Sequence, residues 1–119
     1  MVPSKPSPLL TIQPWASNQP AIWGLEWSSI TPDILDQNLS QITVGFWLDG
    51  QPVPLSQFYQ HRYVTEDGEG FYDWYTVVSN WPKGVTTLKC VQTIASPIFD
   101  GMHNMGVGLL IQDYTVTVP

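Results

Sequence analysis

The sequence has few charged residues, and most of those it has are acidic. Of its 119 residues, 4 are Lys or Arg and 10 are Asp or Glu, which gives a formal net charge of −6 at pH 7. Proteins that bind nucleic acids need clustered basic side chains to displace the counterions of the phosphates. Because the four basic residues are few and scattered along the chain, we expect no nucleic-acid partner.

Cysteine and long apolar runs are also scarce. Cys90 is the single cysteine, so the chain can form no internal disulfide bond. No run of 18 apolar residues is present, and the N-terminus lacks the pattern of a signal peptide, so we expect no membrane span. Residues 1–8 contain three prolines and two serines. They predict an extended linker ahead of a single domain at 9–119, and hence one part of a longer protein.

Proline and glycine, in contrast, are abundant and evenly spread. The chain has 11 prolines and 9 glycines between short runs of β-branched and aromatic residues, which is typical of an all-β domain. The clearest strand is 41–48, where every second residue from Ile42 to Leu48 is apolar. Asp49-Gly50 predicts a tight hairpin, and the prolines in 51–55 place the returning strand at a sheet edge.

Further strands and one short helix complete the predicted domain. Thr31-Pro32 is typical of a helix start and predicts a short crossover helix before residue 40. Gln92 falls on the apolar side of its strand, which predicts a bulge or a hydrogen-bonded buried amide, and a change of phase at Gln112-Asp113 predicts a second bulge. The other predicted strands are 9–12, 22–28, 71–78, 85–94 and 108–118. The sequence therefore predicts an antiparallel β-sandwich of about seven strands.

Two structural motifs carry a resemblance to a known family. They are the hairpin at Leu48-Asp49-Gly50 and the Pro-x-Gly-x-x-x-Leu pattern from Pro82 to Leu88. With its neighbours, from about residue 41 to 118, this pattern resembles bacterial extracellular immunoglobulin-like or fibronectin type III-like domains. The resemblance implies an immunoglobulin-like β-sandwich in a secreted or cell-surface protein. It also implies a binding or spacer role toward a protein or a carbohydrate, and no catalytic residue.

Six tryptophans form the most unusual feature of the composition. Exposed aromatic rings stack on sugar rings, so Trp47, Trp74 and Trp81 are candidate residues for carbohydrate binding. Trp47 is the best of them, because strand alternation places it opposite the apolar face of 41–48. The alternative is that the tryptophans fill the core, as large rings do in most proteins.

An acidic segment is the one candidate metal site with hard ligands. Its four carboxylates, Glu66, Asp67, Glu69 and Asp73, are of the type that binds Ca²⁺, although their spacing is not that of an EF-hand. A solvated hairpin tip is the alternative interpretation. If calcium bound here it would stabilise the loop, and the sequence indicates no other cofactor.

The remaining candidates for chemistry are isolated residues. Met102-His103-Asn104-Met105 brings together soft donors suited to copper(I), or else forms a loop that covers the end of the sandwich. His61 and His103 lie in no recognisable catalytic pattern, and Cys90 at an inward strand position favours an inert core thiol. We therefore expect a non-catalytic structural or interaction module, with a carbohydrate-binding module that uses exposed tryptophans as the alternative.

Overall fold

The computed structural model describes residues 5–6, 10–12 and 16–119, with side chains from residue 16 on. The described chain is all-β apart from one α-helix, α1 (Pro32–Leu39), and one turn of 3-10 helix at Leu55–Gln57. Six strands have six or more residues: β3 (Ala21–Ser29), β4 (Ile42–Leu48), β6 (Tyr59–Val64), β7 (Gly70–Val78), β8 (Gly84–Ile94) and β11 (Gly108–Val118). Five are shorter: β1 (Lys5–Pro6), β2 (Leu10–Ile12), β5 (Gln51–Pro52), β9 (Ile98–Phe99) and β10 (Asn104–Met105).

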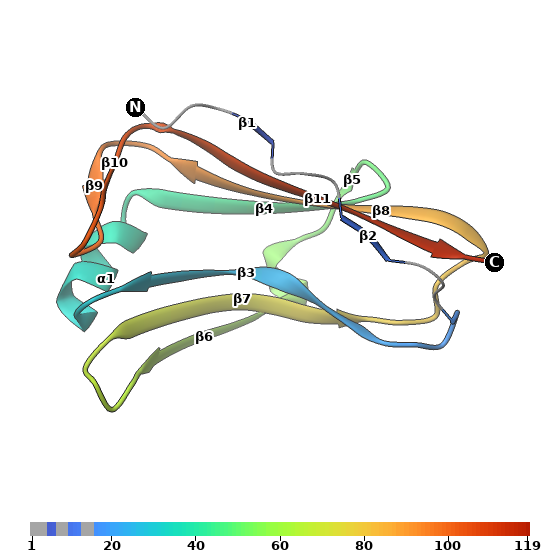
Figure 1. The fold of residues 1–119 in the computed structure, drawn as a ribbon, viewed down its shortest axis with the longest axis horizontal. Coiled ribbons are helices and arrows are strands. Elements are labelled where there is room, and N and C mark those ends of the chain that lie inside the picture. The colour runs from blue at the N-terminus through green and yellow to red at the C-terminus, as the bar shows by residue number, and fades with distance from the viewer. Residues whose placement is uncertain (1–4, 7–9, 13–15) are drawn as a thin grey trace.

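Nine of the eleven described strands form two sheets that face one another, and β9 and β10 pair separately as a two-stranded hairpin (Figure 1). The larger sheet has the order β1-β11-β8-β4-β5, with β2 also paired to β11, and the smaller sheet has the order β3-β7-β6. Neighbouring strands are antiparallel except for β1 and β2, which run parallel to β11. Helix α1 and the β9-β10 hairpin lie at one end of the molecule (Figure 1). No helix in the described ranges is long and apolar enough to cross a membrane.

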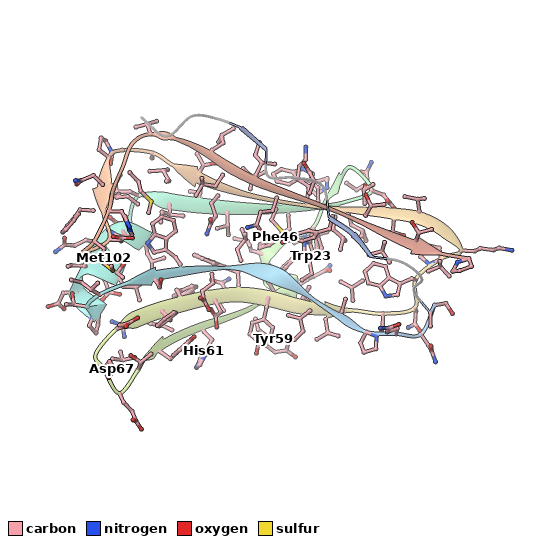
Figure 2. All side chains as sticks on the ribbon, in the orientation of Figure 1. Trp23, Phe46, Tyr59, His61, Asp67 and Met102 are labelled. Carbon is pink, nitrogen blue, oxygen red and sulfur yellow. The ribbon has the colours of Figure 1, made fainter. Side chains whose placement is uncertain are left out.

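Aromatic side chains fill the space between the sheets. Trp23 of the smaller sheet packs edge-on against Phe46 of the larger one, with 5.5 Å between ring centroids, and Phe58 stacks on Phe46 at 3.9 Å (Figure 2). The Trp23 indole N–H donates a hydrogen bond of 2.9 Å to the sulfur of Cys90, which is fully buried. Burial of these rings and their aliphatic neighbours is the main force that holds the two sheets together.

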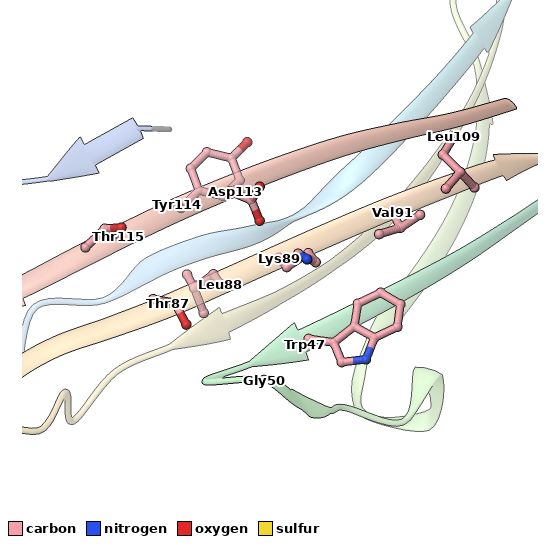
Figure 3. Close-up of a pocket in the computed structure, with 10 residues that line it drawn as sticks. All are labelled: Trp47, Gly50, Thr87, Leu88, Lys89, Val91, Leu109, Asp113, Tyr114 and Thr115. Atoms are coloured by element: carbon pink, nitrogen blue, oxygen red, sulfur yellow. The ribbon is translucent and has the colours of Figure 1, made fainter. Parts of the chain in front are cut away.

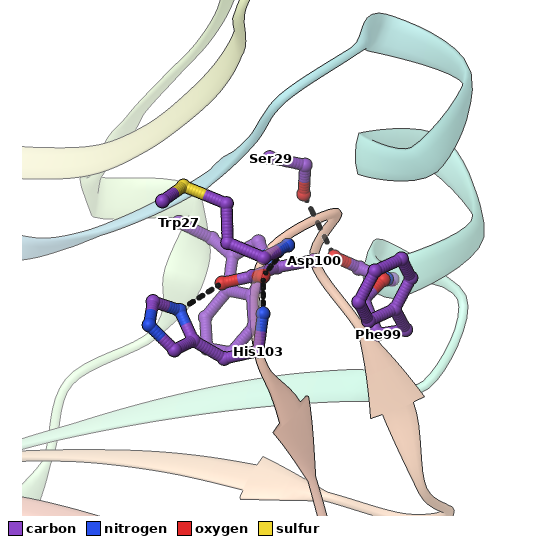
Figure 4. A network of polar contacts seen from close by, with 7 residues as sticks. Trp27, Ser29, Phe99, Asp100 and His103 are labelled. Atoms are coloured by element: carbon purple, nitrogen blue, oxygen red, sulfur yellow. Dashed lines mark hydrogen bonds and ion pairs between the residues drawn. The ribbon is translucent and has the colours of Figure 1, made fainter.

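A buried amide joins the helix to the sheets. Asn38 is 2% exposed, and its Oδ1 accepts hydrogen bonds from Trp27 Nε1 at 3.1 Å and Ser29 Oγ at 2.7 Å. Its Nδ2 donates to the carbonyl of Phe99 at 2.9 Å, so α1, β3 and β9 are tied at one point (Figure 4). The helix begins as the sequence predicts, because the Thr31 side chain accepts from the Ile34 amide at 3.2 Å and caps the helix.

The predicted hairpin and its edge strand are confirmed. Asp49 and Gly50 adopt φ angles of 48° and 79°, the left-handed conformation that a tight hairpin turn requires. β5 lies at the edge of the larger sheet and ends after Pro52, because proline cannot donate a ladder hydrogen bond. The Asp49 carboxylate accepts a 2.8 Å hydrogen bond from the Thr87 amide and so fixes the turn to β8.

The bulge predicted at Gln112-Asp113 is wrong. β11 pairs with β8 residue by residue from Gly108 to Val118 without an interruption. The apparent change of phase arises because Leu109 lies on the outer face of the larger sheet, whereas Tyr114 and Val116 contribute to the core. At Gln92 the structure has the buried amide, 6% exposed, and its Nε2 donates to the Glu26 carbonyl at 3.3 Å.

The structure also has strands that the sequence does not predict. The described chain has eleven strands, where about seven are expected, and β6 was not predicted at all. Lys5 and Pro6, which fall in the predicted linker, pair in parallel with Leu110 and Ile111 of β11. β6 lies at a sheet edge with most of its residues exposed, so the alternation of its aromatic residues with polar ones does not mark a buried apolar face.

Candidate functional site

A groove of about 940 Å³ crosses the outer face of the larger sheet (Figure 3). It is formed by strands β4, β8 and β11, whose inward side chains belong to the core and whose outward side chains line the groove. Its described lining residues include Trp47, Lys89, Val91, Leu109, Asp113 and Thr115. With Tyr114 also part of its lining, the groove combines aromatic rings, apolar walls and a few polar groups, which is the usual composition of a ligand site.

Trp47 is the principal aromatic surface in this groove. A Cβ atom placed on Gly45 would lie 2.7 Å from Trp47 Cη2 and 2.9 Å from Cζ3, so the far end of the indole leans over this glycine. Figure 3, which looks onto the outer face of the sheet, shows the ring broadside. Glycine within a strand commonly marks a place where another group approaches the backbone closely. Here that group is the indole, and its other side is turned to the groove.

Two polar side chains lie in line with Trp47 across the sheet. Lys89 is the register partner of Trp47 on β8, and Asp113 is the register partner of Lys89 on β11. Neither charged group forms a hydrogen bond or an ion pair with another described residue. The ammonium and the carboxylate are thus free to donate to and accept from a bound molecule beside the ring.

The other two candidate tryptophans lie elsewhere. Trp74 is 6% exposed and Trp81 is 3% exposed, so neither can present a ring face to a sugar, and the prediction of exposed rings is wrong for both. Trp74 points inward from β7 and packs with Tyr72 at 4.7 Å. Trp81 donates its indole N–H to the Gln19 carbonyl at 2.7 Å. Burial of the ring with its N–H satisfied is the common state of tryptophan in a core.

The acidic segment does not gather its four carboxylates. Glu66, Asp67 and Glu69 are exposed at the tip of the β6-β7 hairpin, where the Gly68 amide donates to the Thr65 carbonyl at 2.9 Å (Figure 2). Asp73 lies farther along, inside β7. Among the described side chains, no group of three or more His, Cys, Asp or Glu is placed to hold a metal ion.

The Met102–Met105 loop is organised around Asp100 and not around its methionines. Asp100 Oδ1 accepts from the backbone amides of Met102 at 2.8 Å and His103 at 2.6 Å, and Oδ2 lies 3.5 Å from His103 Nδ1 (Figure 4). Burial alone would raise the pKa of Asp100, but these hydrogen bonds together lower it. Met102 is 71% exposed, whereas Met105 packs against the core, so the two thioethers point to different environments.

Cys90 occupies the inward position that the sequence predicts. Its side chain has no exposed surface, and burial raises the pKa of the thiol to about 11. A thiol in this state is almost entirely protonated at neutral pH, so it is a poor nucleophile. The residue is a core side chain.

The outer face of the smaller sheet carries a second cluster, which we name the aromatic slot. The strand register places its members in three rows across β3, β7 and β6. One outer row pairs Tyr75 with Tyr59, and the other outer row pairs Phe71 with Tyr63. The central row, between them, holds the carboxylates of Glu26 and Asp73 and the imidazole of His61. In Figure 2, Tyr59 and His61 point away from the opposite sheet.

Sequence reasoning missed this slot although a signal for it was present. Tyr59, His61 and Tyr63 alternate along β6, and Phe71, Asp73 and Tyr75 alternate in the same way along β7. Two neighbouring segments that alternate in phase place their aromatic residues on one face. The alternation becomes informative only once β6 is known to be a strand paired with β7.

No family model matches this chain, and no curated protein matches its sequence.

Proposed function

We propose that this chain is a non-catalytic interaction module of a larger secreted or cell-surface bacterial protein, and that it binds a carbohydrate in the groove around Trp47. The observation that carries the proposal is the Trp47 ring, which lies broadside on the sheet with Lys89 and Asp113 in line beside it, neither of them paired with another described side chain (Figure 3). An aromatic ring with adjacent hydrogen-bonding groups is suited to a sugar, which has apolar C–H faces and a polar rim.

An immunoglobulin-like arrangement is part of this proposal, and the strand orders support it. In variable-type immunoglobulin domains one sheet includes strands G, F, C and C′, and strands B, E and D are neighbours in the other. When the strands are lettered in chain order, β11-β8-β4-β5 corresponds to G-F-C-C′, and β3-β7-β6 corresponds to B-E-D. The expected secreted or cell-surface setting and the larger parent protein rest on the resemblance of residues 41–118 to bacterial extracellular domains.

The chemistry of the groove favours a neutral saccharide. One pyranose ring would stack on the indole of Trp47. The Lys89 ammonium would donate to sugar hydroxyls and the Asp113 carboxylate would accept from them. Because the groove contains one positive and one negative group, it has no net preference for an anionic or a cationic sugar.

Affinity measurement with a panel of soluble polysaccharides tests the proposal, using affinity electrophoresis followed by calorimetry. At least one polysaccharide should bind the wild-type protein, and Trp47→Ala should lower its affinity about fivefold, because stacking contributes about 1 kcal/mol. Gly45→Ala should lower affinity less, since the added methyl group displaces the indole from the sheet while Trp47 remains present.

Tyr59→Ala is the matched control for Trp47→Ala. Tyr59 is an aromatic residue that is 67% exposed, but it lies on the opposite sheet. The proposal expects this variant to bind polysaccharide as the wild type does. Equal losses in Trp47→Ala and Tyr59→Ala, or an absence of binding across the whole panel, would refute the assignment of carbohydrate to the groove.

A further inference from the structure

The aromatic slot has two walls made of stacked rings. Tyr59 and Tyr75 stack with 5.5 Å between their centroids, and Tyr63 and Phe71 stack at 5.1 Å with an interplanar angle of 8°. The two walls are four residues apart along each strand, a rise of about 13 Å, and the row of Glu26, Asp73 and His61 lies between them. His61 stacks on Tyr63 at 5.3 Å, so the open part of the slot lies between His61 and Tyr59, which are two residues apart, a rise of about 6.7 Å. Since atoms in contact lie about 3.5 Å apart, this spacing leaves room for one flat group beside the Tyr59–Tyr75 wall.

The floor of the slot is a pair of carboxylates that face each other. Glu26 and Asp73 are direct register partners on β3 and β7, and like charges in this position destabilise a sheet. Asp73 Oδ1 is shielded from solvent and has no hydrogen-bond partner. Partial burial raises the pKa of the Glu26 carboxyl, and Asp73 raises it further. A group that donates hydrogen bonds and carries positive charge would satisfy both acids.

The described basic side chains do not supply that group. Arg62 points to the other side of β6 and holds Asp36 of α1, with Nε to Oδ1 at 3.0 Å. Lys83 lies in the turn between β7 and β8, and Lys89 lies on the opposite sheet. His61, the register partner of Asp73, stacks on Tyr63 at 5.3 Å. The slot is therefore an acidic, aromatic surface without a described lysine or arginine of its own.

We propose that the aromatic slot binds an arginine side chain of a partner polypeptide, with the guanidinium stacked on the Tyr59–Tyr75 wall beside His61 and against Glu26 and Asp73. Guanidinium is planar, stacks on aromatic rings and donates paired hydrogen bonds to carboxylates. A hollow of about 660 Å³ adjoins these residues, and its lining includes Glu26, His61, Asp73 and Tyr75 of the slot as well as inward side chains such as Trp74 and Gln92. This surface lies on the opposite sheet from Trp47, so the inference is independent of carbohydrate binding.

A short arginine peptide provides the test. The probe is a five-residue glycine peptide that carries two arginines, titrated into the ¹⁵N-labelled protein at low salt and followed by amide chemical shifts. The expected result is a set of shifts confined to β3, β6 and β7, at residues 22–26, 59–63 and 71–75. A peptide with citrulline in place of arginine, which keeps the shape and loses the charge, should bind at least about tenfold more weakly.

Two variants separate the slot from the overall negative charge of the protein. Glu26→Gln and Asp67→Asn each remove one negative charge, but Asp67 lies at the exposed tip of the β6-β7 hairpin (Figure 2). Glu26→Gln should weaken binding about tenfold, and Asp67→Asn should change it by less than about twofold. Equal effects of the two variants would overturn the proposal, as would shifts that lie outside the slot.

Lysine is the final control for the shape of the slot. A peptide of the same length with two lysines has the same charge but lacks the flat, forked donor group. It should bind several-fold more weakly than the arginine peptide. Equal affinity of the two peptides would show that the slot attracts cations without recognising guanidinium, and would also refute the proposal. Trp47→Ala should bind the arginine peptide as the wild type does.

Discussion

Replacement of Asn38 by leucine tests the connection between α1 and the two strands that it contacts. The side chain has almost no exposed surface and makes three hydrogen bonds, to Trp27, Ser29 and Phe99. Leucine is similar in size and fills the same space, so the expected loss comes mainly from polar groups left without partners. A buried polar group that loses its partner costs about 1 to 3 kcal/mol.

The magnitude depends on how many of these partners can reach water. Trp27 and Ser29 are 6% and 5% exposed, whereas Phe99 is 48% exposed and its carbonyl can be hydrated. Two buried groups are therefore stranded, and the added apolar burial offsets part of their cost. We expect Asn38→Leu to lower the free energy of unfolding by about 3 kcal/mol, a large share of the roughly 5 to 15 kcal/mol of a typical domain.

Urea unfolding followed by tryptophan fluorescence measures this loss, because Trp27 itself reports on the site. Gln37→Leu is the matched control, since Gln37 is the preceding residue of the same helix and is exposed. The control should change stability by less than about 0.5 kcal/mol. A loss below about 1 kcal/mol for Asn38→Leu would refute the reasoning, because the three hydrogen bonds would then contribute little.

Three further predictions follow from titratable groups. Glu26→Gln should stabilise the protein at pH 7 by at most about 0.5 kcal/mol, because Glu26 is exposed and solvent screens its repulsion with Asp73. The raised pKa of Glu26 means that its ionisation weakens the fold as pH rises, so urea midpoints at pH 7 and pH 4 should show the gain only at pH 7. The pKa of Asp100 is lower in the folded protein than its ordinary value, so its ionised form stabilises the fold, and this contribution is lost as the pH falls through the lowered pKa. The stability of Asp100→Asn, measured by urea unfolding, should therefore fall less steeply with acid pH than that of the wild type. Equal pH dependence of the two proteins would contradict this. Cys90 should react with a thiol reagent only as fast as the native protein unfolds, and rapid labelling in native buffer would disprove its burial.

Much of the fold could be predicted from local patterns, because the long inner strands alternate between core and surface. Ile42 and Phe46 of β4 and Leu88 and Cys90 of β8 are buried as their spacing indicates. β6 could not be predicted in this way, since an edge strand with most residues exposed has no buried apolar face. The phase of β11 misled because Leu109 is apolar yet lies on the outer face.

The candidate sites depend on contacts that sequence spacing does not contain. The outward position of Trp47 followed from strand alternation, but Trp74 lies in a strand with aromatic residues on both faces, so its burial could not be read from the pattern. The Glu26–Asp73 pair requires the register of two strands that are far apart in the chain. Such pairing is decided by the packing of the whole sheet.

Iodide quenching of tryptophan fluorescence, with and without a bound polysaccharide, tests the central claim most directly. Four described tryptophans, at positions 23, 27, 74 and 81, are at most 6% exposed, so Trp47 is the described ring that iodide can reach. A Trp15→Phe background removes the one tryptophan whose side chain is not described. If a saccharide covers Trp47, a saturating polysaccharide should abolish most of the quenching, and the effect should vanish in Trp47→Phe. Quenching that stays unchanged while the polysaccharide binds would contradict the account.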